Sequence, residues 1–205
     1  MLVTGTEDGS ALVIHLAGDS LLSFPPLLFP FPTANVTLDP DTAHCYLILS
    51  EDHKSVTYGN TYQNLPDNPK RFKNSFSVLG CDGFTSGRYF WEICVGEEDQ
   101  WMAGVARKSV ERKGDFVRGP EGGIWAIGKW NGAYKVANSP HHLTLSLNSE
   151  LKRIRVSLNY AGGQVAFCDA DTGVHLYSFS GASFTGETLL PFFYVYEKGC
   201  VSISP

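Results

Sequence analysis

The sequence lacks the cysteine pairs that a disulfide framework or a zinc site requires. Its five cysteines are an odd number, with no CxxC pair and no closely spaced set of histidines and cysteines. They are Cys45, Cys81, Cys94, Cys168 and Cys200. Because structural zinc sites draw their ligands from such close pairs, we expect no metal. The last three stand in apolar runs, where a reduced cysteine behaves as a small hydrophobe, so the sequence favours a reducing, cytoplasmic compartment.

Long apolar runs and an excess of positive charge are also missing. No stretch reaches the roughly 18 to 20 apolar residues of a membrane-spanning helix. The chain carries 16 basic and 21 acidic residues, for a formal net charge of −5. A chain without an overall basic field does not attract nucleic acid or an anionic membrane. We therefore expect no nucleic-acid partner and no membrane span.

The first 32 residues differ from the rest of the chain. Prolines are concentrated between residues 24 and 32, and the stretch begins with acidic residues rather than the basic residues of a signal peptide. We predict an N-terminal extension at 1–32, whose order stays open, and one domain at 33–205.

Helical periodicity is absent, and strand patterns take its place. No window shows a convincing i, i+3, i+4, i+7 stripe, so helices should be few and short. From about residue 43 onward, short runs rich in β-branched and aromatic residues alternate with clusters of Gly, Asn, Asp and Pro. In 153–158, for example, Ile154, Val156 and Leu158 share one face. The predicted fold is all-β, with two antiparallel sheets packed face to face as a β-sandwich.

The runs and the turn residues give positions for individual strands. Loops at 159–163 and 169–174 are predicted hairpin turns, because Asn, Asp and Gly tolerate the positive φ of tight turns. The predicted strands are 45–49, 55–58, 88–95, 101–106, 124–130, 143–147, 153–158, 164–168, 175–179, 191–196 and 200–203.

Three stretches resemble catalytic motifs but lack what the chemistry needs. Asp169 and Asp171 follow an apolar strand as in some phosphatases, yet no parallel α/β pattern surrounds them, so we interpret them as turn residues. The run 181–186 has Thr185 where a serine nucleophile elbow needs its second Gly. His141 and His142 are adjacent in extended chain and point apart, which disfavours a shared metal. We predict that the chain is not an enzyme.

Two other stretches are candidates for binding. The connection 107–119 is rich in Arg and Lys, which donate charge-assisted hydrogen bonds to acidic partners or phosphates; the alternative is a solvated connection between strands. Trp130 and Tyr134 flank an Asn-Gly turn signal, and an aromatic residue in a loop can anchor an interface. The alternative is that each packs under its own loop.

A series of motifs is similar to one known family when the motifs are taken in order. They are TLDPDTAH (37–44), LPDNPKRF (65–72), SVLGCDGFTSGRYFWEICVG (77–96), WMAGVARKSVERKG (101–114), GIWAIG (123–128), VSLNYAGGQVAFCDADTGVHLYSFS (156–180) and PFF (191–193). Together they resemble the PRY-SPRY domain, found at the C-terminus of tripartite-motif (TRIM) ubiquitin ligases and in butyrophilin cytoplasmic tails. The resemblance covers 33–205, with PRY at about 33–84 and SPRY at about 85–205.

Two marker motifs of that family also define structural expectations. In 90–95, period-two alternation puts Trp91 on one face and Glu92 on the other. No second catalytic group is spaced to work with Glu92, so we interpret it as a hydrogen-bonded structural carboxylate. The motif LNYA at 158–161 departs from the usual Leu-Asp-Tyr-Glu, although Asn159 keeps an acceptor for the turn.

The resemblance implies a bent β-sandwich that binds through loops at one end and has no cofactor and no catalytic residue. The function it implies is recognition of a target protein, as the substrate-recognition domain of a TRIM-type E3 ubiquitin ligase or a related immune protein. Ligase activity would belong to a RING domain. The expected partner surface comprises Asn60, Tyr62, Asp82, Arg88, Arg112, Lys113, Phe116, Arg118, Trp130, Asn131, Tyr134 and Phe184.

A butyrophilin-like sensor of a small phosphorylated ligand is the alternative function. Its basic pocket would use Arg88, Arg112, Lys113 and Arg118. Butyrophilins that bind such ligands use histidines, and here Tyr89 and Met102 stand where histidines are expected. A small anionic ligand therefore ranks second to a protein target.

Overall fold

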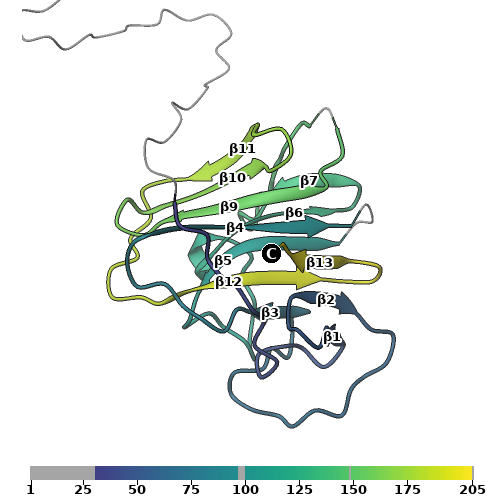
Figure 1. The fold of residues 1–205 in the computed structure, drawn as a ribbon. Helices are drawn as coiled ribbons and strands as arrows, with labels where there is room; N and C mark the ends of the chain where they lie inside the picture. The colour runs from purple at the N-terminus through teal and green to yellow at the C-terminus, as the bar shows by residue number, and fades with distance from the viewer. Residues whose placement is uncertain (1–30, 97–99, 148, 205) are drawn as a thin grey trace, which may run out of the picture. The chain divides into compact units, whose positions relative to one another are not determined.

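The computed structural model describes residues 31–96, 100–147 and 149–204. The N-terminal extension predicted at 1–32 lies outside the described residues except for its last two positions. Phe31 onward forms one compact unit. Figure 1 shows this unit as two layers of strands.

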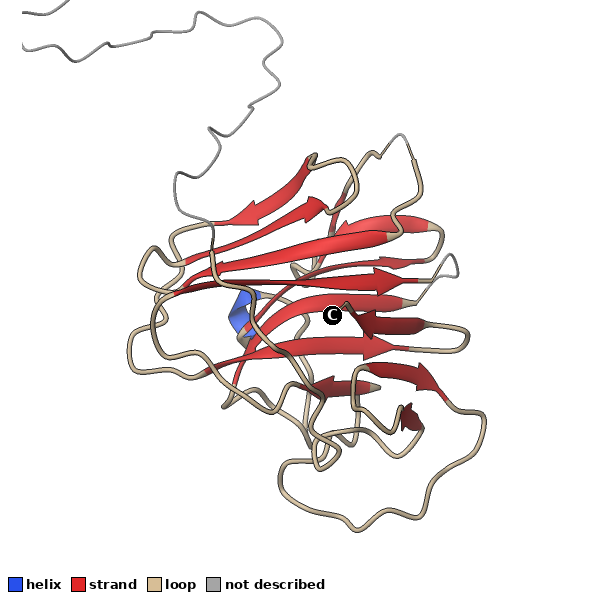
Figure 2. Cartoon of the chain, in the orientation of Figure 1, coloured by secondary structure: helices blue, strands red, loops and turns tan. Residues whose placement is uncertain are grey.

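Two antiparallel sheets form a sandwich, as the sequence predicts (Figures 1 and 2). The seven-stranded sheet has the order β1-β2-β13-β4-β9-β10-β11, and the six-stranded sheet has the order β3-β12-β5-β6-β7-β8. The strands are β1 (Leu47–Leu49), β2 (Ser55–Tyr58), β3 (Ser77–Leu79), β4 (Arg88–Val95), β5 (Trp101–Arg107), β6 (Ile124–Trp130), β7 (Ala133–Val136), β8 (Leu143–Thr144), β9 (Arg153–Asn159), β10 (Gln164–Asp169), β11 (His175–Phe179), β12 (Leu189–Val195) and β13 (Cys200–Ile203). In the described part of the chain the one helical element is the 3-10 turn η1 (Pro120–Gly122).

Five of the predicted strands agree with the structure at both ends. The predictions at 55–58, 88–95, 124–130, 175–179 and 200–203 match β2, β4, β6, β11 and β13 residue for residue. The sequence prediction missed β3 and β7. Both are short, and each is held by a long neighbour, β12 and β6 respectively. The prediction at 143–147 was too long, because ladder pairing stops after Thr144.

The main core lies between the sheets and follows the predicted alternation. Trp91 and Ile93 on β4, and Ile154 and Val156 on β9, are buried in it. Glu92 points the other way and accepts hydrogen bonds from Arg155 at 2.6 and 2.9 Å. Its role as a hydrogen-bonded carboxylate is therefore confirmed.

The outer face of the six-stranded sheet is covered as well. A second apolar cluster joins Phe72 from the N-terminal part of the domain, Met102 and Phe192 from the sheet, and Val110 from the β5–β6 connection. Residues 101–106 of β5 are accordingly buried on both faces. The candidate site lies on this covered outer face.

None of the helices in the described ranges is long and apolar enough to cross a membrane. All five cysteines are present as thiols, and Cys81 is the exposed one. Across the described ranges no three His, Cys, Asp or Glu side chains gather into a group that could hold a metal ion.

Candidate functional site

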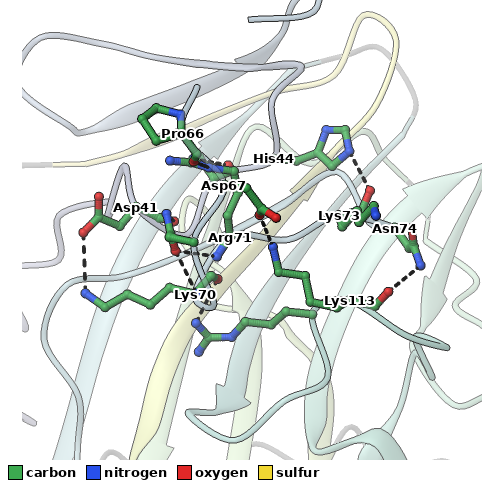
Figure 3. Close-up of polar contacts among 12 residues, drawn as sticks. Asp41, His44, Pro66, Asp67, Lys70, Arg71, Lys73, Asn74 and Lys113 are labelled. Carbon is green, nitrogen blue, oxygen red and sulfur yellow. Dashed lines mark hydrogen bonds and ion pairs between the residues drawn. The ribbon is translucent and has the colours of Figure 1, made fainter. Parts of the chain in front are cut away.

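The β5–β6 connection is fastened to the N-terminal part of the domain by its own basic residues (Figure 3). The Lys113 ammonium group pairs with Asp67, and the Asn74 side chain donates to the Lys113 carbonyl oxygen at 2.7 Å. Arg112 donates to the Lys70 carbonyl oxygen at 2.9 Å, and its guanidinium lies over the Phe72 ring. These side chains therefore hold the connection in place.

Glu111 closes the turn that carries these two basic residues. One of its carboxylate oxygens accepts the backbone N–H groups of Arg112, Lys113 and Gly114 at 2.7 to 2.9 Å. These bonds, led by that of Gly114, lower the pKa of Glu111, because they stabilise the charged form. The charged groups of Arg112 and Lys113, which were predicted to bind a partner, thus contact groups of the same domain.

Beyond this turn, the connection lays Phe116 and Arg118 across the outer face of the sheet. The Phe116 ring contacts the rings of Phe72 and Phe192 at centroid distances of 6.0 and 6.3 Å. The Arg118 guanidinium lies 5.8 Å from the Phe116 ring centre and 5.0 Å from that of Tyr194. Arg118 is half-buried, so a cation with an exposed edge is held over two aromatic faces.

Trp130 ends β6 at a tight turn on the same face. Asn131 and Gly132 have φ of 53° and 71°, the positive values that a two-residue hairpin with an Asn-Gly sequence requires. The Lys135 ammonium lies 5.4 Å from the Trp130 ring centre, and the His142 ring meets Trp130 edge-on at 5.2 Å. Trp130 is half-buried and packs against the outer apolar cluster, so it is firmly held yet accessible.

A row of paired residues connects these two groups. Tyr194 on β12 pairs with Met102, Met102 with Gly128, and Gly128 with Lys135 on β7. Four adjacent strands place the ends of the row about 14 Å apart, at roughly 4.8 Å per strand. We call Phe116, Arg118, Trp130, Lys135, His142 and Tyr194 the Trp130 surface.

Positive charge dominates the Trp130 surface. Neither Arg118 nor Lys135 forms an ion pair within the described part of the chain. Burial lowers the pKa of His142, and the nearby charges of Arg118 and Lys135 lower it further. A carboxylate or another anion placed on this surface would meet two cations already oriented by aromatic rings.

A row of aromatic rings extends from Tyr194 toward the N-terminal part of the domain. The Phe76 ring contacts Tyr194 at 6.4 Å and Tyr196, which directly follows β12, at 4.9 Å. Beyond it, Tyr196 meets Tyr58 at 5.2 Å, Tyr58 stacks on Tyr46 at 5.7 Å, and Tyr46 meets Tyr62 at 5.7 Å. Tyr62 is 57% exposed at the end of this row, and Asn60 is exposed beside it. The aromatic row places these two predicted residues on the flank of the Trp130 surface.

Comparison with known proteins identifies the family. The PRY model, an SPRY-associated domain, matches residues 36–84, and the SPRY domain model matches residues 88–204. The chain belongs to the PRY-SPRY family. A PRY-SPRY domain is a protein-interaction module, which agrees with an exposed aromatic and cationic surface.

The relatives include both groups that the motifs resemble. The chain is 42% identical over 165 residues to butyrophilin subfamily 1 member A1 of Bos taurus, covering 80% of this chain and 31% of that protein. It is 43% identical over 166 residues to the E3 ubiquitin-protein ligase TRIM69 of Mus musculus, covering 81% and 32%. This chain therefore spans about a third of the length of these relatives. The solved TRIM65 PSpry domain has the same fold, with a TM-score of 0.73 at 20% identity over 84% of this chain and 90% of that one.

Two residues predicted for the partner surface of this PRY-SPRY domain lie elsewhere. Phe184 is 2% exposed, packed edge-on against Trp125 at 4.9 Å, so its prediction as a surface residue was wrong. Tyr134 is part of β7 rather than a loop, and its hydroxyl donates to Glu150 at 2.6 Å. Tyr134 was predicted from the Asn-Gly turn signal and Phe184 from the family resemblance, whereas partners distant in sequence hold both side chains.

Two others are exposed but outside the Trp130 surface. Arg88 begins β4 and alternates with the inward-facing Trp91, which places it on the outer face of the seven-stranded sheet, where its guanidinium lies over Phe31. Asp82 is exposed in the connection from β3 to β4. Loops of the predicted surface are thus distributed over more than one side of the sandwich.

The sequence prediction also missed three members of the surface. Lys135 and Tyr194 lie within strands. The alternation of side chains in a strand assigns each residue to a face of the sheet, but it does not predict that Arg118 from a distant connection will cover that face. His142 lies outside the strands, and nothing in the sequence indicated its contact to Trp130. The Asn-Gly turn was the one local signal that could have directed attention to this face.

Proposed function

We propose that the Trp130 surface recognises an acidic segment of a target protein. The observation that carries this proposal is the placement of Arg118 and Lys135 over aromatic rings with no carboxylate partner of their own in the described residues. Interfaces concentrate binding energy in buried aromatic and Arg side chains, and Trp130 with Arg118 supplies both. Opposite charge on the partner would speed association and set its orientation.

The parent protein that we propose is a TRIM-type E3 ubiquitin ligase or a related immune protein, acting in the cytoplasm. The name of TRIM69 supports the ligase class, and that of the bovine butyrophilin supports the related class. Within such a protein, this domain would select the substrate, while another domain would carry out ubiquitin transfer. Two copies on one dimeric parent would raise the apparent affinity for a repeated target.

Affinity capture from an immune-cell lysate tests the proposal, with captured proteins identified by mass spectrometry. The baits are the wild-type chain, Trp130→Ala, and Ile48→Ala as a matched control, because Ile48 is 50% exposed on β1 at the far edge of the other sheet. We expect proteins that are retained by wild type and Ile48→Ala and lost from Trp130→Ala. A loss of about 2 kcal/mol, or roughly thirtyfold in affinity, is typical of a central aromatic anchor. Identical captures from all three baits would contradict the assignment of the surface.

A small phosphorylated ligand receives less support from the described contacts. Arg112 and Lys113 of the expected pocket bind Lys70 and Asp67 within the domain, and Arg88 lies on the other sheet. Titration with pyrophosphate in a calorimeter tests this alternative directly. Binding heat with the wild-type chain that disappears in Lys113→Ala would favour the phosphorylated ligand over the protein target. We expect no binding heat with pyrophosphate.

A further inference from the structure

A groove lies between the outermost strands of the two sheets, beside the Trp130 surface, because its lining residue Thr144 pairs with Lys135. Its volume is 400 Å³, and one wall is β8 with the segment that follows, while the other wall is the β10–β11 hairpin. Figure 1 shows β11 as the last strand of its sheet. The lining residues of the groove are Thr144, Leu145, Ser146, Leu147, Ser149, Leu151, Asp169, Thr172, Val174, His175 and Leu176.

The β11 wall has an edge without a strand partner in the described residues. There, β11 pairs with β10 alone, and β8 pairs with β7 alone. The Asp169 N–H donates to the Val174 carbonyl oxygen, whereas the Ala170 N–H donates to the Arg153 carbonyl oxygen on β9. The backbone N–H and C=O groups of odd-numbered β10 residues therefore point toward β11. Because Phe167 pairs with Tyr177 and Ala166 with Ser178, the backbone N–H and C=O of Ser178 point outward.

Among the described residues, this edge shows none of the features that usually protect one. Proteins shield edge strands with Lys, Pro or a covering segment, and β11 has the sequence HLYSF, without either residue. The opposite end of the same sheet shows such protection. There the Gln63 side chain donates to the carbonyl oxygens of Leu47 and Cys45 at 2.6 and 3.3 Å, so the β1 edge is occupied.

Apolar side chains line the groove beside this edge. Leu145, Leu147 and Leu176 pack against the main core from its open side and remain partly exposed. Val174 also lines the groove and is 56% exposed, so these four apolar side chains form one accessible patch. An added strand would cover them with alternate side chains while its backbone pairs with β11.

The charge of the groove restricts the strand that fits. No Lys or Arg is among its described lining residues, and the one carboxylate among them, Asp169, is bound within its own turn by the Thr172 hydroxyl at 2.7 Å and the Asp171 N–H at 2.9 Å. A charged partner side chain would lose its hydration here without gaining a counter-ion. We propose that the groove between β8 and β11 binds an uncharged, extended segment of a partner protein, with apolar side chains at alternate positions, as an eighth strand of the seven-stranded sheet.

Selection from a phage-displayed library of short linear peptides tests this proposal. The bait is the full chain with Trp130→Ala, so that peptides for the Trp130 surface are depleted. Selected peptides are then titrated against that chain and against versions that also carry Ser178→Pro, Val174→Lys or Ile48→Lys. Ser178→Pro removes an outward donor, and Val174→Lys puts charge on the rim. Ile48→Lys adds the same charge at the protected β1 edge as a matched control.

We expect enriched peptides that are uncharged and alternate in polarity. Their affinity should fall about tenfold in the Ser178→Pro and Val174→Lys chains, and it should be unchanged in the Ile48→Lys chain. The Ser178 amide should become protected from hydrogen exchange when a peptide binds. Failure to enrich peptides, or binding that is insensitive to both changes, would overturn the proposal.

A self-association that Val174→Lys abolishes would make a second copy of this chain the occupant, and the proposed partner segment would be wrong. Sedimentation of the unliganded chain over a range of concentrations detects this outcome. Because these measurements use the Trp130→Ala background, their failure would leave the function proposed for the Trp130 surface standing.

Discussion

The Arg118 guanidinium carbon lies 5.0 Å from the ring centre of Tyr194, and this contact links the β5–β6 connection to the outer face of the six-stranded sheet. Burial raises the pKa of Tyr194, and the Arg118 charge acts against that increase. The contact also presents the cation on the same face as Trp130. The Ser139 N–H donates to the Arg118 carbonyl oxygen at 2.8 Å and holds the Arg118 backbone beside this face.

Charge reversal on the Trp130 surface should weaken partner binding mainly through the association rate. Arg118→Glu and Lys135→Glu each replace a cation that would steer an acidic partner, so we expect slower association and a smaller dependence on salt. Surface plasmon resonance at low and high salt with a captured partner measures both effects. Lys152→Glu makes the same charge change in the exposed connection before β9 and should bind as wild type does. Equal losses in all three variants would indicate a nonspecific charge effect instead.

Glu92→Gln should destabilise the domain. The Glu92 side chain is 17% exposed and accepts bonds from Arg155 and Arg153, so the neutral amide would leave Arg155 poorly compensated, whereas Arg153 keeps its pair with Asp171 at 2.7 Å. We expect a loss of about 1 to 3 kcal/mol in the free energy of unfolding, measured by urea denaturation. Lys70→Met removes exposed ion pairs at 3.6 and 3.9 Å and should change stability by less than about 1 kcal/mol. Equal effects of the two changes would argue against a structural role for Glu92.

Phe184→Ala distinguishes a core side chain from a surface anchor. Since Phe184 is 2% exposed against Trp125 and Tyr160, we expect the free energy of unfolding to fall by about 3 to 5 kcal/mol. Tyr62→Ala removes an aromatic residue that is 57% exposed, and a much smaller change is expected there. A fully stable Phe184→Ala variant that fails to bind its partner would restore the surface assignment.

Lys113→Met tests whether this lysine serves structure or ligand binding. Its carboxylate partner Asp67 is 84% exposed, so the pair should contribute little to the free energy of unfolding. Hydrogen exchange of residues 111–118 should nevertheless become faster, because the turn loses one attachment to the domain. Unchanged exchange would show that Asn74 and Arg112 hold the turn without it.

The domain should lose stability below about pH 6.5 in part through His44. Burial lowers the pKa of His44 in the folded state, and the Arg71 charge lowers it further, while the bond to the Lys73 carbonyl oxygen opposes them. A lowered folded pKa means that the unfolded chain binds more protons as the pH falls, so stability decreases from about pH 6.5 downward and is retained above it.

Unfolding measured at about pH 7.5 and about pH 5.5 should therefore show a smaller difference in His44→Gln than in the wild type. A residual difference is expected, because burial also lowers the pKa values of His142 and His175. An NMR titration in which the His44 ring protonates above the usual range would contradict the sign of this effect.

Local patterns in the sequence determined the fold class and most strands. Alternation in Arg88–Val95 and Arg153–Asn159 assigns each side chain to a face, because neighbouring residues of a strand point to opposite sides. Turn residues such as Asn131 and Gly132 mark hairpins through their tolerance of positive φ. Both signals depend on a few adjacent residues, so they can be interpreted without knowing the rest of the chain.

Only the tertiary structure decided which side chains meet to form a surface. The sequence suggests that Arg112 and Lys113 are exposed cations, yet the segment 67–74 supplies their partners, the Lys70 carbonyl oxygen and the Asp67 carboxylate. Phe184 was expected at the surface from the family resemblance and is buried, while Tyr194 lies within a strand and its ring contacts Arg118. These outcomes depend on which connection covers which sheet face, and that is set by packing between segments far apart in the chain, for which no local pattern exists.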